Sequence, residues 1–278
     1  MKIVVSGYGL IAPNTRNVEE FLYNLQHGVN SLELIDGEGY QNESNIVGVI
    51  HKGLEEVDED RKIKRLPKVT KLGIVAGKEA LKSAEIDLDG KKVGVFIGTS
   101  LGSITERPFQ DSVLHINNNE YRKIPITFPH YVNYHSITSS IAHFLGVKGV
   151  TKTITTGCTS SLEAIESALL YLKSGKLDVA IVGGTESSID RTVTYAFART
   201  RVLPLNQSLK DGAVPFHEDS KGFAVAEAAG VIILEREEDA LYRGAPIKGE
   251  VVDVISNNDG VYIYSMDESG DQMLNALK

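Results

Sequence analysis

Cysteine and tryptophan are nearly absent from this sequence of 278 residues, which contains one cysteine and no tryptophan. A single cysteine excludes an internal disulfide and a thiolate-rich zinc site. Long apolar runs are also missing, since Val93–Ile97 falls far short of the roughly 18 to 20 residues that span a bilayer. The first residues likewise lack the apolar segment of a secretory signal. We therefore expect a cytoplasmic protein that does not enter a membrane.

Basic residues do not outnumber acidic residues either. The 29 lysines and arginines are outnumbered by 37 aspartates and glutamates, which gives a net charge of −8. This balance argues against binding of nucleic acid or of an anionic membrane through overall basicity. The hydrophobic content of 42% is sufficient for a substantial core and excludes a disordered or fibrous chain.

Short runs rich in valine and isoleucine alternate with longer segments in which apolar residues recur at helical spacing. This alternation is typical of an α/β protein with a buried sheet. The segment 184–228 mixes turn formers with charges and does not fit one regular element, so we expect an ordered excursion over the surface or an interface there. Strands are expected near 2–6, 93–98, 152–156, 178–183 and 229–235, and helices near 18–27, 69–84, 138–145 and 159–174.

Two glycine-rich segments follow expected strands. Gly7–Ala12 fits the pattern G-x-G-x-x-A of dinucleotide-binding proteins, but Pro13 interrupts the helix that should begin there, so we interpret the segment as a tight turn. Gly98–Gly102 lacks the lysine that would contact a nucleotide phosphate. We expect this second segment to form a loop near an active site.

The only cysteine, Cys158, lies where an expected strand changes into an expected helix. The β-favouring residues end at Gly157, and an apolar helical face that closes at Gly175 follows. Free amide groups at the start of such a helix stabilise a thiolate, and they can donate to the oxyanion of an attacked carbonyl. Cys158 is thus either a nucleophile or, as most lone cysteines are, a buried and inert residue.

Four sequence blocks occur in the order and spacing of a known enzyme family. With the opening Val4–Gly9, they resemble a β-ketoacyl-acyl-carrier-protein synthase from end to end of the chain. The resemblance implies a thiolase-like layered α/β fold, with an N-terminal half at residues 1–243 and the beginning of a C-terminal half at 244–278. The blocks are Thr156–Ser161, Asp178–Glu186, Pro215–Phe216 with Gly222–Phe223, and Glu227–Glu235.

The resemblance also implies a reaction. Cys158 takes an acyl group as a thioester, and a malonyl-carrier-protein extender then loses CO2 and attacks this thioester, which lengthens a fatty acid or polyketide chain. The implied partners are an acyl carrier protein, acyl and malonyl thioesters, and a second ketosynthase chain in a homodimer or heterodimer. No metal or organic cofactor is implied, because decarboxylation supplies the carbon nucleophile.

The family's two histidines, in contrast, have no counterpart in this sequence. They lie in the second half of the fold, with a lysine nearby, whereas the only histidine after Cys158 is His217. His217 stands where the family usually has an aspartate, so we assign it no catalytic role. Two hypotheses stay open: the chain is the N-terminal part of a condensing enzyme, incomplete or inactive by itself, or it is a non-condensing scaffold or chain-length partner. The retained Cys158 favours the first.

Docking of an acidic carrier protein requires a local basic surface, even in a chain of net charge −8. We take the densest run of basic residues as the candidate docking surface, and the alternative is a solvated loop without a partner. The run comprises Arg61, Lys62, Lys64, Arg65 and Lys68.

Overall fold

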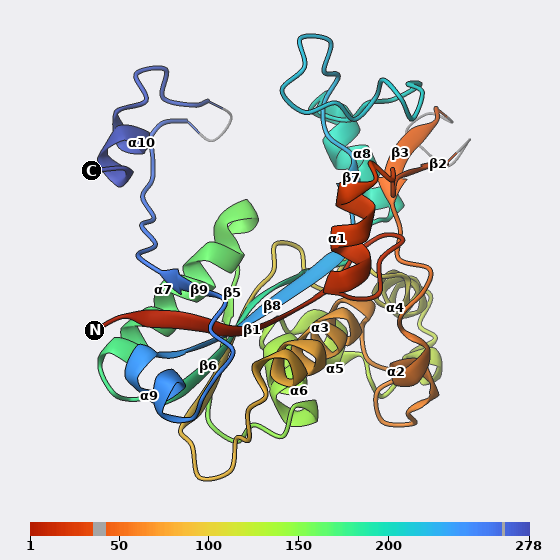
Figure 1. Cartoon of the computed structure of the whole chain (residues 1–278). Helices are drawn as coiled ribbons and strands as arrows, with labels where there is room; N and C mark the ends of the chain where they lie inside the picture. Colours follow the sequence, from red (N-terminus) through yellow and green to blue (C-terminus); the bar gives the residue numbers. More distant parts are fainter. Residues whose placement is uncertain (36–42, 263–264) are drawn as a thin grey trace.

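A six-stranded sheet forms the centre of the molecule, shown in Figure 1 as a computed structural model that describes residues 1–35, 43–262 and 265–278. Its strand order is β5-β4-β6-β8-β1-β9. Neighbouring strands are parallel from β5 to β6 and antiparallel from β6 to β9. The strands are β1 (Ile3–Ile11), β4 (Val93–Gly98), β5 (Val150–Ile154), β6 (Val179–Glu186), β8 (Ala228–Arg236) and β9 (Gly249–Val251).

Helices cover both faces of this sheet. α3 (Lys68–Ala84) and α6 (His135–Phe144) pack on one face, and α7 (Ser160–Lys173) packs on the other. Along β4, Val95 and Ile97 join the core under α3, whereas Phe96 joins the core under α7. Successive side chains of a strand point to opposite faces, so an unbroken apolar run fills both layers. The layered α/β fold expected from the sequence is confirmed.

A small three-stranded sheet and several short helices surround this centre. The small sheet consists of β2 (Glu33–Ile35), β3 (Asn45–Gly48) and β7 (Val225–Ala226). No helix in the described ranges is long and apolar enough to cross a membrane. The remaining helices of the described residues are α1 (Val18–Gln26), α2 (Glu55–Glu59), α4 (Arg107–Asn117), η2 (Tyr121–Lys123), α5 (Pro129–Val132), η3 (Gly157–Thr159), α8 (Arg191–Arg199), α9 (Glu237–Tyr242) and α10 (Asp271–Ala276).

The interpretation of Gly7–Ala12 as a tight turn is wrong, because β1 runs through most of this segment. The glycines of this segment instead allow a helix to pack closely against the strand. A Cβ atom added to Gly7 would lie 2.4 Å from the carbonyl oxygen of Ala80, and one added to Gly9 would lie 2.1 Å from that of Ala76. Glycine thus allows α3 to lie directly on β1.

The segment 184–228 is only partly irregular. β6 continues to Glu186, and α8 follows with its own N-cap, since the Asp190 side chain accepts a hydrogen bond from Val193 N. The segment therefore forms no single regular element, as expected, and no helix or strand is assigned to the described residues between α8 and β7.

The end of the chain departs from the layers. β9 pairs with β1 at the edge of the central sheet, and α10 stands apart from the layers in Figure 1. A hydrogen bond links this segment to α7, because Ser256 Oγ donates to Glu163 Oε1 at 3.0 Å. The division into a half at 1–243 and a further part at 244–278 stays a prediction from the resemblance.

Candidate active site

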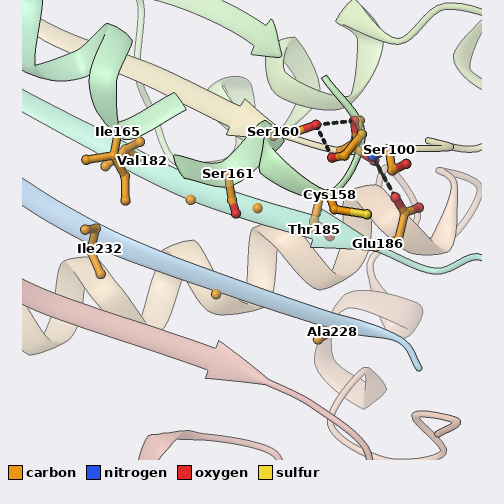
Figure 2. A pocket seen from close by; sticks show the side chains of 16 residues that line it. Ser100, Cys158, Ser160, Ser161, Ile165, Val182, Thr185, Glu186, Ala228 and Ile232 are labelled. Atoms are coloured by element: carbon orange, nitrogen blue, oxygen red, sulfur yellow. Dashed lines mark hydrogen bonds between the residues drawn. The ribbon is translucent and has the colours of Figure 1, made fainter. Parts of the chain in front are cut away.

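A cavity of about 520 Å³ opens at the carboxyl ends of β4 and β6, beside the start of α7. Figure 2 shows Cys158 and Glu186 near one end of it and Ile165 and Ile232 near the other. In open α/β sheets, this end of the strands is where ligands bind. The lining residues are Gly98, Thr99, Ser100, Gly157, Cys158, Ser160, Ser161, Ile165, Val182, Gly183, Gly184, Thr185, Glu186, Ala228, Gly230 and Ile232.

Cys158 lies in the short turn η3, which connects β5 to α7 as the sequence predicts. Gly157 has a φ of +71°, the left-handed conformation that glycine adopts most readily. The Ser160 hydroxyl donates to Gly157 O at 2.6 Å and joins the turn to the helix. Cys158 is exposed and lines the cavity, so it is not a buried cysteine.

Two glycines bring the strand ends against the first turn of α7. A Cβ atom on Gly98, the last residue of β4, would lie 2.4 Å from Ser161 N. One on Gly184 in β6 would lie 2.8 Å from the Ser161 Cβ. Side chains at these positions would push the helix, and Cys158 with it, away from the sheet.

The carboxylate of Glu186 fixes the loop that follows β4. Its Oε2 accepts hydrogen bonds from Ser100 N at 2.7 Å and from Leu101 N at 3.0 Å. Its Oε1 accepts one from the Ser188 hydroxyl at 2.5 Å. Hydrogen bonds to an ionised carboxylate are strong, so Glu186 ties the end of β6 to the wall of the cavity. The glycine-rich segment Gly98–Gly102 thus forms a loop beside Cys158.

A second carboxylate, that of Glu163, lies in the first turn of α7. Its Oε1 accepts hydrogen bonds from Thr159 Oγ1 at 2.7 Å and from Ser256 Oγ at 3.0 Å. The hydrogen bond from Thr159 is the main cause that holds the pKa of Glu163 below its usual range. Glu163 therefore links the turn that carries Cys158 to the segment that follows β9.

The far part of the cavity is apolar. Its side chains are Ile165 of α7, Val182 of β6 and Ile232 of β8. The strands meet closely beneath them, since a Cβ atom on Gly183 would lie 1.9 Å from Gly230 O. The cavity therefore combines a thiol with an apolar surface, which suits a thioester that carries an apolar acyl group.

Histidine is missing from this cavity, although all seven histidines lie in the described ranges. His217 is exposed, and its Nδ1 accepts a hydrogen bond from Asp219 N at 3.1 Å. His130 Nδ1 lies 3.3 Å from Ser136 Oγ. Across the described part of the chain, no group of three or more histidine, cysteine or acidic side chains could hold a metal ion. This chain brings no histidine to Cys158.

The basic run separates into two parts. The ammonium group of Lys68 lies 2.5 Å from Glu227 Oε2 and donates to Ile50 O at 3.1 Å. Glu227 is buried and also accepts a hydrogen bond from Ile50 N. Lys68 thus neutralises a buried carboxylate, and its inclusion in the docking surface is wrong. The exposed members of the run are Arg61, Lys62, Lys64 and Arg65.

Comparison with known proteins decides the family. The family described as "Beta-ketoacyl synthase, N-terminal domain" matches residues 1–240. The chain belongs to this family. One relative, the 3-oxoacyl-[acyl-carrier-protein] synthase 2 of Staphylococcus aureus (strain MRSA252), is 27% identical over 270 residues. The alignment covers 95% of this chain and 64% of that relative, so the chain spans less than two thirds of its length.

Solved structures share the architecture of this chain. A type II PKS acyl-carrier protein in complex with its ketosynthase gives a TM-score of 0.85 at 23% identity, over 99% of this chain and 68% of that one. The ishigamide ketosynthase/chain length factor gives 0.78 at 22% identity, over 91% of this chain and 62% of that one. At these identities the likeness establishes the fold, and it confirms the thiolase-like layered arrangement.

Proposed function

We propose that this chain provides the acyl-accepting part of a β-ketoacyl-acyl-carrier-protein synthase, with Cys158 as the nucleophile. In the first step, the Cys158 thiolate attacks the carbonyl carbon of an acyl thioester. A new carbon–sulfur bond forms at Cys158, the donor's carbon–sulfur bond breaks, and the donor thiolate leaves and takes up the proton that Cys158 released. The acyl group is then held as a thioester on the chain.

The observation that carries this proposal is the position of Cys158, which is exposed on the cavity at the start of α7. The first amide groups of a helix have no partner within the helix. They attract negative charge, both on the sulfur before attack and on the carbonyl oxygen as the tetrahedral intermediate forms. The glycine contacts at Gly98 and Gly184 keep this helix start close to the strand ends.

Intact mass and peptide mapping after incubation with an acyl thioester test the proposal. We expect one acyl adduct on the wild-type chain, located at Cys158, and none on Cys158→Ala. A wild-type chain that gains no adduct, or gains it at another residue, would overturn the assignment.

The second step, condensation with a malonyl extender, is expected to require groups that this chain does not bring to Cys158. None of its histidines lines the cavity. We therefore expect the chain alone to accept an acyl group but to form no ketoacyl product from a malonyl thioester. Formation of that product by the purified chain would show that its own residues suffice.

The second candidate function is a scaffold or chain-length partner that does not condense. No histidine lines the cavity, which favours this function, and one structural neighbour is named a ketosynthase/chain length factor. The exposed thiol favours the condensing enzyme. The mass experiment separates the two functions, because a pure scaffold needs no acyl group on Cys158.

An acyl carrier protein is the proposed acyl donor. Carrier proteins are acidic, and an exposed basic surface would steer their approach. Four exposed residues, Arg61, Lys62, Lys64 and Arg65, supply such a surface.

We expect Lys62→Glu/Arg65→Glu to weaken carrier binding at low salt by about tenfold. The control Lys210→Glu/Lys221→Glu makes the same charge change at exposed residues elsewhere, and equal binding by both variants would exclude this surface.

We also propose a dimer in the cytoplasm, with a second copy or with a related ketosynthase. β5 is the outermost strand on its side of the central sheet, so its outer edge has no neighbouring strand in that sheet. An open edge of this kind is a ready site for pairing with a strand of another chain. Sedimentation of the purified chain tests the dimer, and a monomer at all concentrations would contradict pairing between copies.

A further inference from the structure

A second cavity of about 520 Å³ lies at the opposite end of the three parallel strands. Three loops form it: 88–93 leads into β4, 146–150 leads into β5, and 176–177 precedes β6. Gly149 allows two of these loops to meet, because a Cβ atom there would lie 1.9 Å from Val93 O. The cavity is therefore built by the sheet itself, at the end of the strands away from Cys158.

Four of the residues that line this second cavity are lysines, and we call it the lysine cavity. All four side chains are exposed. In the described part of the chain, the lysines that form ion pairs are others, namely Lys2, Lys68, Lys71, Lys78 and Lys123. The lysines of the cavity are Lys91, Lys92, Lys148 and Lys176.

Three carboxylates, those of Asp87, Asp89 and Asp178, lie in or beside the lysine cavity and face its four lysines. Asp89 is the one carboxylate among its lining residues. Asp178 accepts hydrogen bonds from Lys92 N at 2.9 Å and from Arg236 Nη2 at 2.8 Å. Burial opposes ionisation of Asp178, but these two bonds lower its pKa overall. The four ammonium groups thus leave an excess of positive charge, although the chain as a whole has a net charge of −8.

The four lysines are not needed to cap the C-terminal ends of nearby helices. α6 and α7 both end beside the cavity, and the carbonyl groups at a helix end attract cations. Backbone N–H groups already satisfy several of those carbonyls in each helix. Gly146 and Gly175 adopt the left-handed conformation of such caps, with φ of +75° and +69°, and Val147 N donates to Ala142 O at 2.8 Å. The ammonium groups are therefore not needed as capping donors.

We propose that the lysine cavity binds a small, multiply charged phosphate compound such as a diphosphate or triphosphate. Ammonium groups gathered from three loops repel one another, and an anion bound among them removes this cost. Lysine binds phosphate as a compact point charge. The volume also fits, because small-molecule sites measure roughly 300 to 1,000 Å³. A concave site of this size suits a small polyanion better than the broad surface of an acidic protein.

Calorimetric titration of the full chain with tripolyphosphate at low salt tests this proposal. We expect saturable binding at one site per chain, weakened by added salt because the contacts are electrostatic. Lys148→Glu/Lys176→Glu should weaken binding by at least about tenfold, since it replaces two attractions by two repulsions. The neutral variant Lys148→Gln/Lys176→Gln should fall between this variant and the wild type, and it keeps the test valid if charge reversal impairs folding.

Three outcomes would overturn the proposal. The first is the absence of saturable binding by the wild type. The second is an equal loss in the control Lys210→Glu/Lys221→Glu, whose exposed lysines lie outside the cavity. The third is binding of a polyglutamate peptide without binding of tripolyphosphate, which would indicate a docking surface for an acidic protein. The readout is independent of acyl transfer, so it does not depend on the proposed function.

Discussion

The two ends of the three parallel strands carry cavities of similar volume and opposite chemistry. At the carboxyl ends, the cavity holds the exposed thiol of Cys158, the carboxylate of Glu186 and an apolar interior. At the amino ends, the cavity is lined by four lysines and by no histidine or cysteine. The same strands support both cavities, so the loops determine the chemistry and the sheet determines only where the loops meet.

The direction of the helices explains part of this difference. α7 begins at the carboxyl ends of the strands and ends at their amino ends. Its first turn presents amide groups, which favour an anion such as a thiolate. Its last turn presents carbonyl groups, which the backbone cap at Gly175 satisfies. A nucleophile is therefore better placed at the first end than at the second.

Gly98→Ala should have the largest effect among substitutions that test this comparison. Its Cβ atom would meet backbone atoms of Ser160 and Ser161 at 2.4 Å, and backbone cannot move aside as a flexible side chain can. We expect the free energy of unfolding to fall by about 3 kcal/mol and acylation of Cys158 to be lost. Urea unfolding measures the first effect, and adduct mass measures the second.

Gly146→Ala is the matched control at the amino ends. A Cβ atom at this position meets nothing within 4 Å. The loss of stability therefore comes only from the residue's backbone φ of +75°. We expect a loss of about 1 kcal/mol in the free energy of unfolding, with normal acylation of Cys158. If both glycine variants lose acylation equally, close packing at Gly98 has no special role in placing the thiol.

Glu186→Ala should have an intermediate effect on stability and a specific effect on the first cavity. It removes the acceptor of the hydrogen bonds from Ser100 N and Leu101 N. We expect a loss of about 2 kcal/mol in the free energy of unfolding, with slower acylation of Cys158. Glu186→Gln keeps one carbonyl acceptor and should recover part of the rate. Tripolyphosphate binding should be unchanged in both variants, and a change there would show that the two ends are coupled.

Local sequence patterns were enough to predict five strands of the central sheet and the position of Cys158, but not the short edge strand β9. Runs such as Val93–Ile97 are apolar because they are buried on both faces, and that property is visible in the sequence. The strand, Gly157 and helix around Cys158 are contiguous, so they could be read together. Gly7 and Gly9 within β1 were misinterpreted because the residues of α3 that they contact lie about 70 positions away in the chain.

Interactions of charged side chains with partners far away in the sequence were even harder to predict. The basic run at 61–68 was visible because its members are consecutive, yet Lys68 pairs with Glu227 across 159 positions of sequence. The lysine cavity was invisible, because Lys91, Lys148 and Lys176 belong to three separate loops. Glu186 was visible in the sequence only as the last residue of the block Asp178–Glu186, and its role depends on Ser100 and Leu101. Contacts between segments that are distant in the sequence can be predicted only when the fold is known.

Relocating the thiol tests most directly the central claim that position makes Cys158 an acyl acceptor. The variant Cys158→Ala/Gln26→Cys moves the single thiol to the exposed last residue of α1, at the carbonyl end of a helix and outside the cavity. Time-resolved mass spectrometry with an acyl thioester should show an adduct on the wild type at least about tenfold faster than on this variant. Equal rates, or faster acylation of the relocated thiol, would contradict the account.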